Sequence, residues 1–407
     1  MPVGAGVYAR PVLKIVRLAL AVAISAAAAL GAVRLLTPAD GDSGVRRQLA
    51  FLRHELESGA AEDAQRLFPE GYFFLYALYG LTSVDAGRPD DARWALSRLE
   101  SDAGRAPFLG DMPLRYGVFY RGWINWLRGG IVGLTRDPAE TRTFQQESAA
   151  IAAAFDESPT PYLVSYPGQA WPVDSTVAMA SLRLHDKLLT PAYDATALRW
   201  LAGVKARLDP ATRLIPHTVD AAAGEPTSGA QGTSQSLLNR FLPEIDASFA
   251  AQHYSRFRTA FLDAPLGIGP AVREHPRGSD GPSNVDSGPL VLGISLSATA
   301  VAIGAARVHG DTSLATGLSQ FGEVAGVPVS TPWTKRYALG VAPIGDAFLA
   351  WSNSARPWVA TAEPQPPTRF ISRWWRLPLL TFFLAVGAAP WLLGAAFRRR
   401  RSVAPPA

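Results

Sequence analysis

The chain has 407 residues, of which 48% are hydrophobic, and it contains no cysteine. This apolar content excludes a globally disordered chain, and the lack of cysteine excludes disulfides, zinc–thiolate sites, iron–sulfur clusters and cysteine nucleophiles. The net charge of +5 arises at the two ends, because residues 1–36 hold four basic residues, residues 370–407 hold six, and neither end holds an acidic one. The remaining body is mildly acidic, at −5, which argues against nucleic-acid binding.

The N-terminal segment, residues 1–36, is predicted to be a membrane anchor or a signal segment. Arg10, Lys14 and Arg17 precede 16 uncharged residues, and this order of charge and apolarity fits a signal peptide that is cleaved after its alanine-rich half. It fits an uncleaved anchor as well, which we favour because Arg17 and Arg34 can extend their charged ends to the membrane surfaces. With either alternative, the following domain is expected outside the cytoplasm.

Residues 41–358 are predicted to form one all-α domain. Apolar residues recur at spacings of three and four, Gly and Pro separate the segments, and alternating strand-like runs are scarce. About a dozen helices with short connections favour an (α/α) toroid of about six helical hairpins over an open solenoid, since no fixed repeat is found. The predicted helices are residues 45–58, 71–86, 90–101, 114–126, 140–155, 173–188, 193–208, 234–241, 243–261, 289–308, 313–325 and 337–352.

A transmembrane helix is predicted at residues 375–397. Its last 21 residues carry no charge, which is long enough to span a bilayer, and Trp374, Trp375 and Trp391 suit the two membrane interfaces. A Pro-rich linker at residues 359–374 precedes this helix.

The expected location is the cell membrane, with the main domain extracytoplasmic. The basic tail at residues 398–407 contains four consecutive arginines, which favour the cytoplasmic side. Both ends would then lie in the cytoplasm and residues 40–365 outside it, so the lipid bilayer is one expected partner. The oligomeric state is not predicted.

The first candidate site is the loop that leads into the helix at residue 173. It combines Tyr166, Gln169, Trp171 and Asp174, and a concave binding site needs this mixture of aromatic walls and a few fixed polar groups. Asp174 is a candidate catalytic carboxylate, with the three other residues as substrate-binding candidates. The alternative is that Asp174 is a helix N-cap.

A second candidate site is the dense polar run from residue 272 to 288. Glu274 and Asp286 are candidate catalytic acids, because burial can raise a carboxyl pKa toward neutrality. Arg273 and Asp280 are candidate substrate-binding residues. Asp286 is paired with Asp174 as a possible acid and base, with a second N-cap as the alternative for Asp286. The distance between the two carboxylates cannot be read from the sequence, so no stereochemical outcome is predicted.

His217 is a further catalytic candidate, although a single histidine is more often structural. No metal-binding spacing, P-loop, dinucleotide-binding glycine pattern or nucleophile elbow occurs in the sequence. The expectation is therefore an activity without metal or cofactor.

The order of several motifs resembles the linalool dehydratase-isomerase family over roughly residues 45–355. The matching segments are Tyr76-Ala77-Leu78-Tyr79-Gly80-Leu81, Tyr120-Arg121-Gly122, Tyr166-Pro167-x-x-x-Trp171-x-x-Asp174-Ser175, Leu184-His185-Asp186-Lys187-Leu188, Leu208-Asp209-Pro210, Tyr254-x-Arg256-Phe257-x-x-x-Phe261, Val272-Arg273-Glu274 and Gly310-Asp311. The resemblance implies an (α/α)-barrel and a cofactor-free dehydration or allylic rearrangement of a small terpene alcohol outside the cytoplasm.

The sequence departs from this family at the residues that carry its chemistry. Ser165 and Asp174 stand where the family has cysteines, and Trp123 stands in place of a histidine, so Trp123 is a candidate substrate-binding residue instead. An acidic partner near the N-terminal helix has no clear match, although Glu55 lies near. Any activity would therefore have to rest on carboxylates.

Three functions fit these features. The first is an acid/base lyase or isomerase that acts on a terpenoid or lipid alcohol, its cationic transition state held by aromatic faces. The second is a non-catalytic, membrane-tethered module that binds a ligand or serves as a scaffold. The third is a hydrolase that acts on glycans with paired carboxylates.

Overall fold

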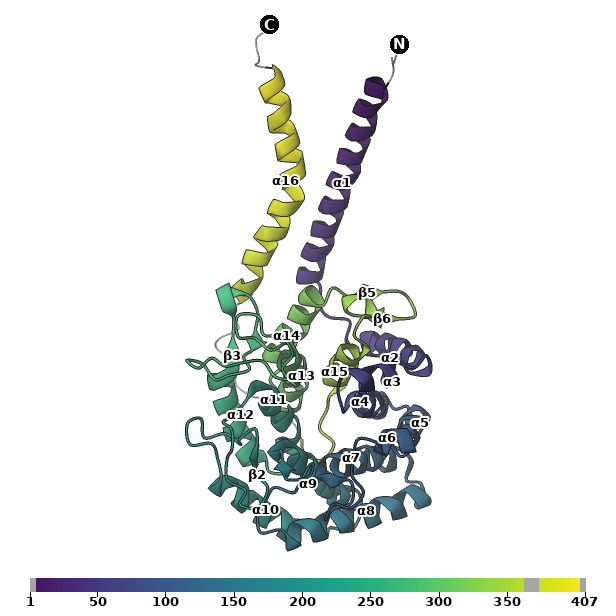
Figure 1. Cartoon of the computed structure of the whole chain (residues 1–407), viewed down its shortest axis with the longest axis vertical. Coiled ribbons are helices and arrows are strands. Elements are labelled where there is room, and N and C mark those ends of the chain that lie inside the picture. Colours follow the sequence, from purple (N-terminus) through teal and green to yellow (C-terminus); the bar gives the residue numbers. More distant parts are fainter. Residues whose placement is uncertain (1–4, 362–372, 403–407) are drawn as a thin grey trace.

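The computed structural model describes residues 5–361 and 373–402, and most of these are helical. The helices of the body are α2 (Gly41–Glu57), α3 (Ala60–Leu67), α4 (Gly71–Asp85), α5 (Pro89–Leu99), α6 (Asp102–Arg105), α7 (Gly117–Thr135), α8 (Pro138–Glu157), α9 (Pro172–Leu188), α10 (Asp194–Ala206), α11 (Gly232–Phe241), α12 (Ala247–Phe261), α13 (Leu296–Val308), α14 (Thr312–Ala325) and α15 (Pro343–Ser354). Two long helices, α1 (Ala5–Leu36) and α16 (Arg376–Ser402), extend away from this body (Figure 1).

Strands are few and short in the described ranges. Each of three antiparallel pairs joins two strands of two residues: β1 (Gln169–Ala170) with β2 (Val219–Asp220), β3 (Leu262–Asp263) with β4 (Ala271–Val272), and β5 (Val329–Ser330) with β6 (Lys335–Arg336). Short 3₁₀ turns complete the element set at η1 (Leu242–Glu244), η2 (Pro265–Gly267), η3 (Ala338–Gly340) and η4 (Arg373–Trp375). The predominantly helical prediction is confirmed.

The body helices form two concentric layers around a closed, toroid-like circuit. The inner helices α4, α7, α9, α11, α13 and α15 contact one another in this order, and α15 returns to α4. The outer helices α5, α8, α10, α12, α14 and α2 cover them, and Figure 1 shows the chain following this circuit around the body. Successive inner helices run in the same direction, so all six of their N-terminal ends can meet at one end of the barrel.

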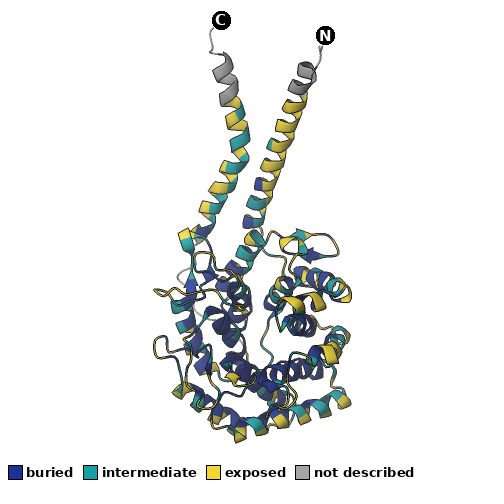
Figure 2. Cartoon of the chain, viewed as in Figure 1, coloured by how far each residue is buried: buried dark blue, intermediate teal, exposed yellow. Residues whose placement is uncertain are grey.

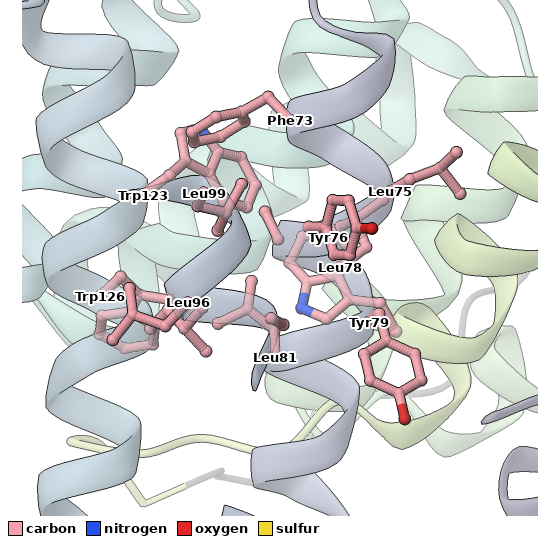
Figure 3. Close-up of a cluster of buried hydrophobic side chains, with 14 of the residues drawn as sticks. Phe73, Leu75, Tyr76, Leu78, Tyr79, Leu81, Leu96, Leu99, Trp123 and Trp126 are labelled. Carbon is pink, nitrogen blue, oxygen red and sulfur yellow. The ribbon is translucent and has the colours of Figure 1, made fainter. Parts of the chain in front are cut away.

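Small residues allow the inner helices to pack closely. A Cβ atom at Gly122 of α7 would lie 3.0 Å from Ala178 of α9, which leaves little room for a side chain. Figure 2 shows the buried residues concentrated in this inner layer. Figure 3 shows aromatic and aliphatic side chains of the same core, including Phe73, Leu96 and Trp126.

Several local predictions differ from the structure. The helix predicted at residues 114–126 extends to Thr135, and the one predicted from residue 337 begins only at Pro343. The helix predicted from residue 289 begins only at Leu296, and its N-cap is Ser295, whose hydroxyl accepts the backbone N–H of Ala298 at 3.1 Å. Gly288 and Gly293 adopt positive φ angles of 60° and 79°, which end any continuous helix through this loop. Helix α3 was not predicted, because its eight residues are too short to show a clear apolar period.

The end of the barrel formed by the C-termini of the inner helices is closed by a buried ionic cluster. Arg240 contacts Glu244, with 3.5 Å between Nη1 and Oε1, and Asp85 lies close enough for its charge to act on Arg240. Glu244 accepts three backbone N–H groups from residues 358–360, and the indole of Trp358 stacks on Trp126 with ring centroids 4.5 Å apart. The predicted linker therefore begins within the body, and its Pro-rich part lies outside the described residues.

Helices α1 and α16 pack against each other along their length. Ser25 donates a hydrogen bond to the carbonyl of Gly387 at 2.8 Å and accepts one from the indole of Trp391 at 2.8 Å. The pair is antiparallel, so the start of α1 and the end of α16 both lie at the end distant from the body (Figure 1). By length and composition, residues 12–36 and 376–395 could each cross a membrane, and hardly any of their side chains are buried.

Candidate functional site

A cavity of about 560 Å³ lies at the N-terminal ends of the inner helices. Its walls are mostly apolar and aromatic, and only a few polar groups reach it. This combination is typical of small-molecule sites. The lining includes Glu70, Phe119, Trp123, Tyr166, Trp171, Asp174, Thr233, Ser234 and Asp286, together with Leu318, Phe321, Gly322 and Ala325.

Asp174 lies in the first turn of α9 and faces the cavity, with 4% of the residue exposed. The N-cap alternative is wrong, because Trp171 holds the cap position and no side chain caps this helix. Instead, Oδ2 of Asp174 accepts a hydrogen bond from Ser165 Oγ at 2.6 Å. Ser165 Oγ in turn accepts the backbone N–H of Trp171 at 3.2 Å, which fixes the hydroxyl proton toward Asp174.

The loop that carries Ser165 is held against the start of α7. The backbone N–H of Val118 donates to the carbonyl of Val164 at 3.0 Å. Gly117 allows this approach, because a Cβ atom there would lie 2.2 Å from the carbonyl oxygen of Ser165, and its φ is +80°. The position of the hydroxyl beside Asp174 is therefore set by backbone contacts.

Burial raises the pKa of Asp174 to about 8, although the hydrogen bond from Ser165 opposes this change, and the charges of Asp286 and Glu70 raise the pKa further. At neutral pH this carboxyl is therefore mostly protonated. Since Ser165 donates to Oδ2, the proton belongs on Oδ1, to which no described residue donates. Asp174 can thus donate a proton into the cavity, as a general acid must.

A second carboxyl group enters the cavity beside a tyrosine. The hydroxyl of Tyr166 donates to Oε1 of Glu70 at 2.6 Å. Burial, followed by the charge of Glu70, raises the pKa of Tyr166 well above its ordinary value, so this phenol keeps its proton. The ring of Tyr166 meets Trp171 edge-on, with centroids 5.6 Å apart, and it lies 6.0 Å from the ring of Phe119.

Asp286 lies on the loop before α13, at the rim of the cavity. It is not an N-cap, because this helix starts ten residues later and is capped by Ser295. The residue is exposed and lines the cavity. Desolvation of its carboxyl group by the surrounding protein raises its pKa, and the charge of Glu70 raises this pKa further. The charge of Asp286 in turn raises the pKa of Asp174, and both carboxyl groups line the same cavity.

The structure thus brings Asp174, Asp286, Tyr166, Trp171 and Trp123 together around the cavity. The indole N–H of Trp123 is buried without a hydrogen-bond partner among the described residues. A ligand hydroxyl that reached this N–H would satisfy it.

Glu274 and His217 lie behind the cavity wall. Glu274 accepts hydrogen bonds from the hydroxyl and backbone N–H of Thr233, at 2.9 and 3.2 Å, and burial raises its pKa to about 7. A ring nitrogen of His217 contacts the hydroxyl of Ser234, and burial lowers the histidine pKa to about 4. Both residues therefore support the first turn of α11, which lines the cavity through Thr233 and Ser234.

The remaining predicted binding residues are directed elsewhere. Arg273 forms ion pairs with Asp263 at 3.3 Å and with Asp280 at 2.9 Å, and the Asp280 side chain is 94% exposed. Gln169 pairs through its backbone with Asp220 and its side chain is exposed. The dense polar run therefore contributes Asp286 to the cavity, Glu274 is buried behind the cavity wall, and Arg273 pairs with Asp280 near the surface.

Glu70 was not found by sequence reasoning, and Glu55 was named in its place. The available signal was the stretch Phe68-Pro69-Glu70-Gly71 immediately before an apolar helix, which places an acidic group at a helix start. An acidic residue at a helix start is explained by its favourable interaction with the helix dipole. The sequence alone therefore gives no reason to choose Glu70 as a site residue.

The alkaline limb of the pH–activity profile is expected near pH 8. Asp174 must be protonated to act as an acid, so activity should fall as pH rises through its pKa of about 8. Removing the Ser165 hydrogen bond, which lowers this pKa, by Ser165→Ala should move the limb to higher pH. Turnover measured from pH 6 to 10 tests both statements, and an unchanged limb in the variant would contradict the role of Ser165.

Comparisons with known proteins add little to this geometry. No family model matches the chain, and the search of curated proteins finds no match. Among solved structures, a GH76 alpha-mannanase from Bacteroides thetaiotaomicron, solved as a selenomethionine derivative, is similar with a TM-score of 0.43 and 12% identity. The match covers 69% of this chain and 85% of the mannanase chain. A TM-score and a sequence identity this low support no inference about activity.

Proposed function

We propose that this protein is a membrane-anchored, extracytoplasmic enzyme that catalyses acid/base elimination or isomerisation of a terpenoid or lipid alcohol. The observation that carries the proposal is the buried carboxyl group of Asp174, with its pKa raised to about 8, in an aromatic cavity that Asp286 and Glu70 also line. Perturbed carboxyl groups that converge in one apolar cavity are typical of active sites.

In the proposed reaction, Oδ1 of Asp174 donates its proton to the substrate hydroxyl. The C–O bond then breaks, its electron pair leaves with the oxygen as water, and a carbocation remains. The carboxylate of Asp286 removes a proton from the adjacent carbon, and the electrons of that C–H bond form the new double bond. The proton gained by Asp286 returns to Asp174 through water, so the net reaction is alcohol to alkene plus water.

The aromatic walls support a cationic intermediate. Trp171, Tyr166 and Phe119 line the cavity, and the negative π density of an aromatic face can stabilise a developing positive charge without reacting with it. An apolar cavity also keeps water away from such a cation. The resemblance to linalool dehydratase-isomerases agrees with this class of reaction, with carboxylates in place of that family's cysteines.

The test is turnover of a panel of alcohols. We expect terpene and long-chain allylic alcohols to give alkenes or rearranged alcohols, detected by gas chromatography with mass spectrometry. Glycan hydrolysis is the competing reaction for paired carboxylates, and release of reducing sugar from mannans with no alkene formation would overturn the proposal. A ligand retained stoichiometrically by a protein with neither activity would favour the non-catalytic module.

The membrane part of the proposal has a separate test. Arg17 and the four arginines near the C-terminus belong to the same distant end of the α1–α16 pair, which the positive-inside rule places in the cytoplasm. A reporter fused after the last residue should therefore be active in the cytoplasm, and one inserted in the exposed turn at Ala222 should be active outside. Both reporters active on one side would contradict this topology.

A further inference from the structure

The cavity has a side limb that leaves the inner ring of helices. Leu318, Phe321, Gly322 and Ala325 belong to α14, which is an outer helix, yet they line the cavity together with residues of α13 and α15. Small residues are frequent among the cavity-lining residues of α13, α14 and α15, among them Ala298, Ala300, Gly322, Ala325 and Gly345. Glu323 of α14 is not among the lining residues, since it accepts hydrogen bonds from Lys335 and Tyr337, but Asp346 of α15 does line the cavity.

This limb lies beside the two helices that we propose to cross the membrane. Helix α14 contacts α1, and the ring of Phe321 meets Trp375 at the start of α16 with centroids 6.4 Å apart. Gln320 of α14 bonds to the end of α1 and to the start of α16. Its side-chain N–H donates to the carbonyl of Thr37 at 3.4 Å, and its side-chain oxygen accepts a hydrogen bond from Arg376. Figure 1 shows α14 at the side of the body from which α1 extends.

The chain that follows α14 carries exposed apolar side chains at the same side. The guanidinium of Arg34, near the end of α1, donates to the carbonyl of Pro328. Nearby exposed residues are Val327, Trp333, Leu339 and Val341, which are 53%, 77%, 68% and 82% exposed. Large apolar side chains gathered next to membrane-spanning helices favour contact with the lipid surface.

We propose that the substrate is a membrane-resident, long-chain amphipathic lipid, which places its hydroxyl head at Asp174 and its hydrocarbon chain in the α14 limb. This inference rests on the proposed function and narrows its substrate class. A soluble terpene alcohol would need only the aromatic part of the cavity. The limb provides apolar surface on the side of α14 that contacts α1, so a hydrocarbon chain can leave the bilayer for the limb without being exposed to water.

The limb can be blocked without touching the carboxyl groups. A Cβ atom at Gly322 would meet one atom within 4 Å, a methyl group of Leu349 at 3.9 Å, so a leucine there can fit and project into the limb. The matched control is Gly133→Leu on the exposed side of α7, where the nearest atoms are those of Leu188 at 3.7 and 3.8 Å. Both substitutions replace a helical glycine by the same side chain.

The experiment uses the full chain in phosphatidylglycerol vesicles with two photoreactive probes, a long-chain and a short-chain alcohol, each with a terminal diazirine. We expect the long-chain probe to label peptides of α14, and Gly322→Leu to reduce this labelling about tenfold at subsaturating probe, which corresponds to about 1.4 kcal/mol. Gly133→Leu should label as the wild type does, and the short-chain probe should label both variants equally near Asp174.

Labelling of the Asp174→Asn variant distinguishes a failure of the proposed chemistry from a failure of the lipid inference. If the long-chain probe labels α14 in this variant but no alcohol is ever turned over by the wild type, the lipid site stands and the proposed chemistry is wrong. If alcohols are turned over but α14 is not labelled, or if Gly322→Leu leaves the labelling unchanged, the lipid inference is overturned.

Discussion

Asp174→Asn is expected to abolish turnover while the protein remains folded. The amide cannot donate a proton of comparable acidity, and loss of a positioned general acid typically costs about 10²–10⁴-fold in rate. The amide oxygen can still accept the hydrogen bond from Ser165 that Oδ2 now accepts at 2.6 Å, so the loop should keep its position. Turnover of the best alcohol substrate, measured in detergent micelles at pH 6.5, gives the comparison.

The stability of Asp174→Asn as a function of pH tests the protonation state of Asp174 independently of activity. Because the pKa of Asp174 is raised on folding, its favourable contribution is complete at low pH and is lost as pH rises toward about 8. The neutral amide does not change with pH, so Asp174→Asn should gain in melting temperature relative to the wild type between pH 6 and pH 9. A difference in melting temperature that does not change with pH would contradict a protonated Asp174.

Asp286→Asn should also abolish turnover, since it removes the proposed base. Asp280→Asn is the matched control, because it lies on the same polar loop but its side chain is 94% exposed and pairs with Arg273 away from the cavity. We expect the control to keep full activity. Undiminished turnover in both Asp174→Asn and Asp286→Asn would reject the assignment of these two carboxyl groups.

The helical body was predictable because most of its helices are long enough to show their period. The predicted start at residue 173 lies within one residue of the observed start of α9 at Pro172. The predicted start at residue 289 is seven residues too early, since the apolar run Pro289–Leu292 continues into α13 by composition. Positive φ angles at Gly288 and Gly293 stop the helix there, and single glycines do not reveal their φ in a sequence.

The sequence predicted cavity-lining residues best where aromatic and acidic residues lie close together in the chain. Tyr166, Trp171 and Asp174 fall within nine residues, so their shared environment follows from one loop and one helix start. Glu70 lies 96 residues before Tyr166, and only the packing of α4 against α7 and of α7 against α9 brings them to hydrogen-bond distance. Arg273 and Asp280 show the reverse error, because a charge-rich segment can satisfy its own charges at the surface.

The second large effect is expected at the opposite end of the barrel, where Arg240→Met should destabilise the protein by about 3–5 kcal/mol at pH 7. Arg240 is fully buried, and its removal takes away the cation that acts on both Glu244 and Asp85, although Asp85 keeps an ion pair with Arg356 at 3.4 Å. Denaturant unfolding in detergent micelles measures the loss, and Arg66→Met, at an ion pair on the surface, is the control, with an expected change within about 0.5 kcal/mol.

This loss should become smaller at pH 5. Burial raises the pKa of Asp85 to about 6 even with Arg240 present, and the charge of Arg240 opposes that rise. Without Arg240 the pKa of Asp85 rises further, so at pH 5 the carboxyl is neutral in the folded variant and no longer needs a cation. A loss of stability that is equal at both pH values would show that Arg240 acts through packing rather than through its charge. Below the melting temperature, activity should be retained, because Phe241 and Trp351 separate Arg240 from Trp123 and the cavity.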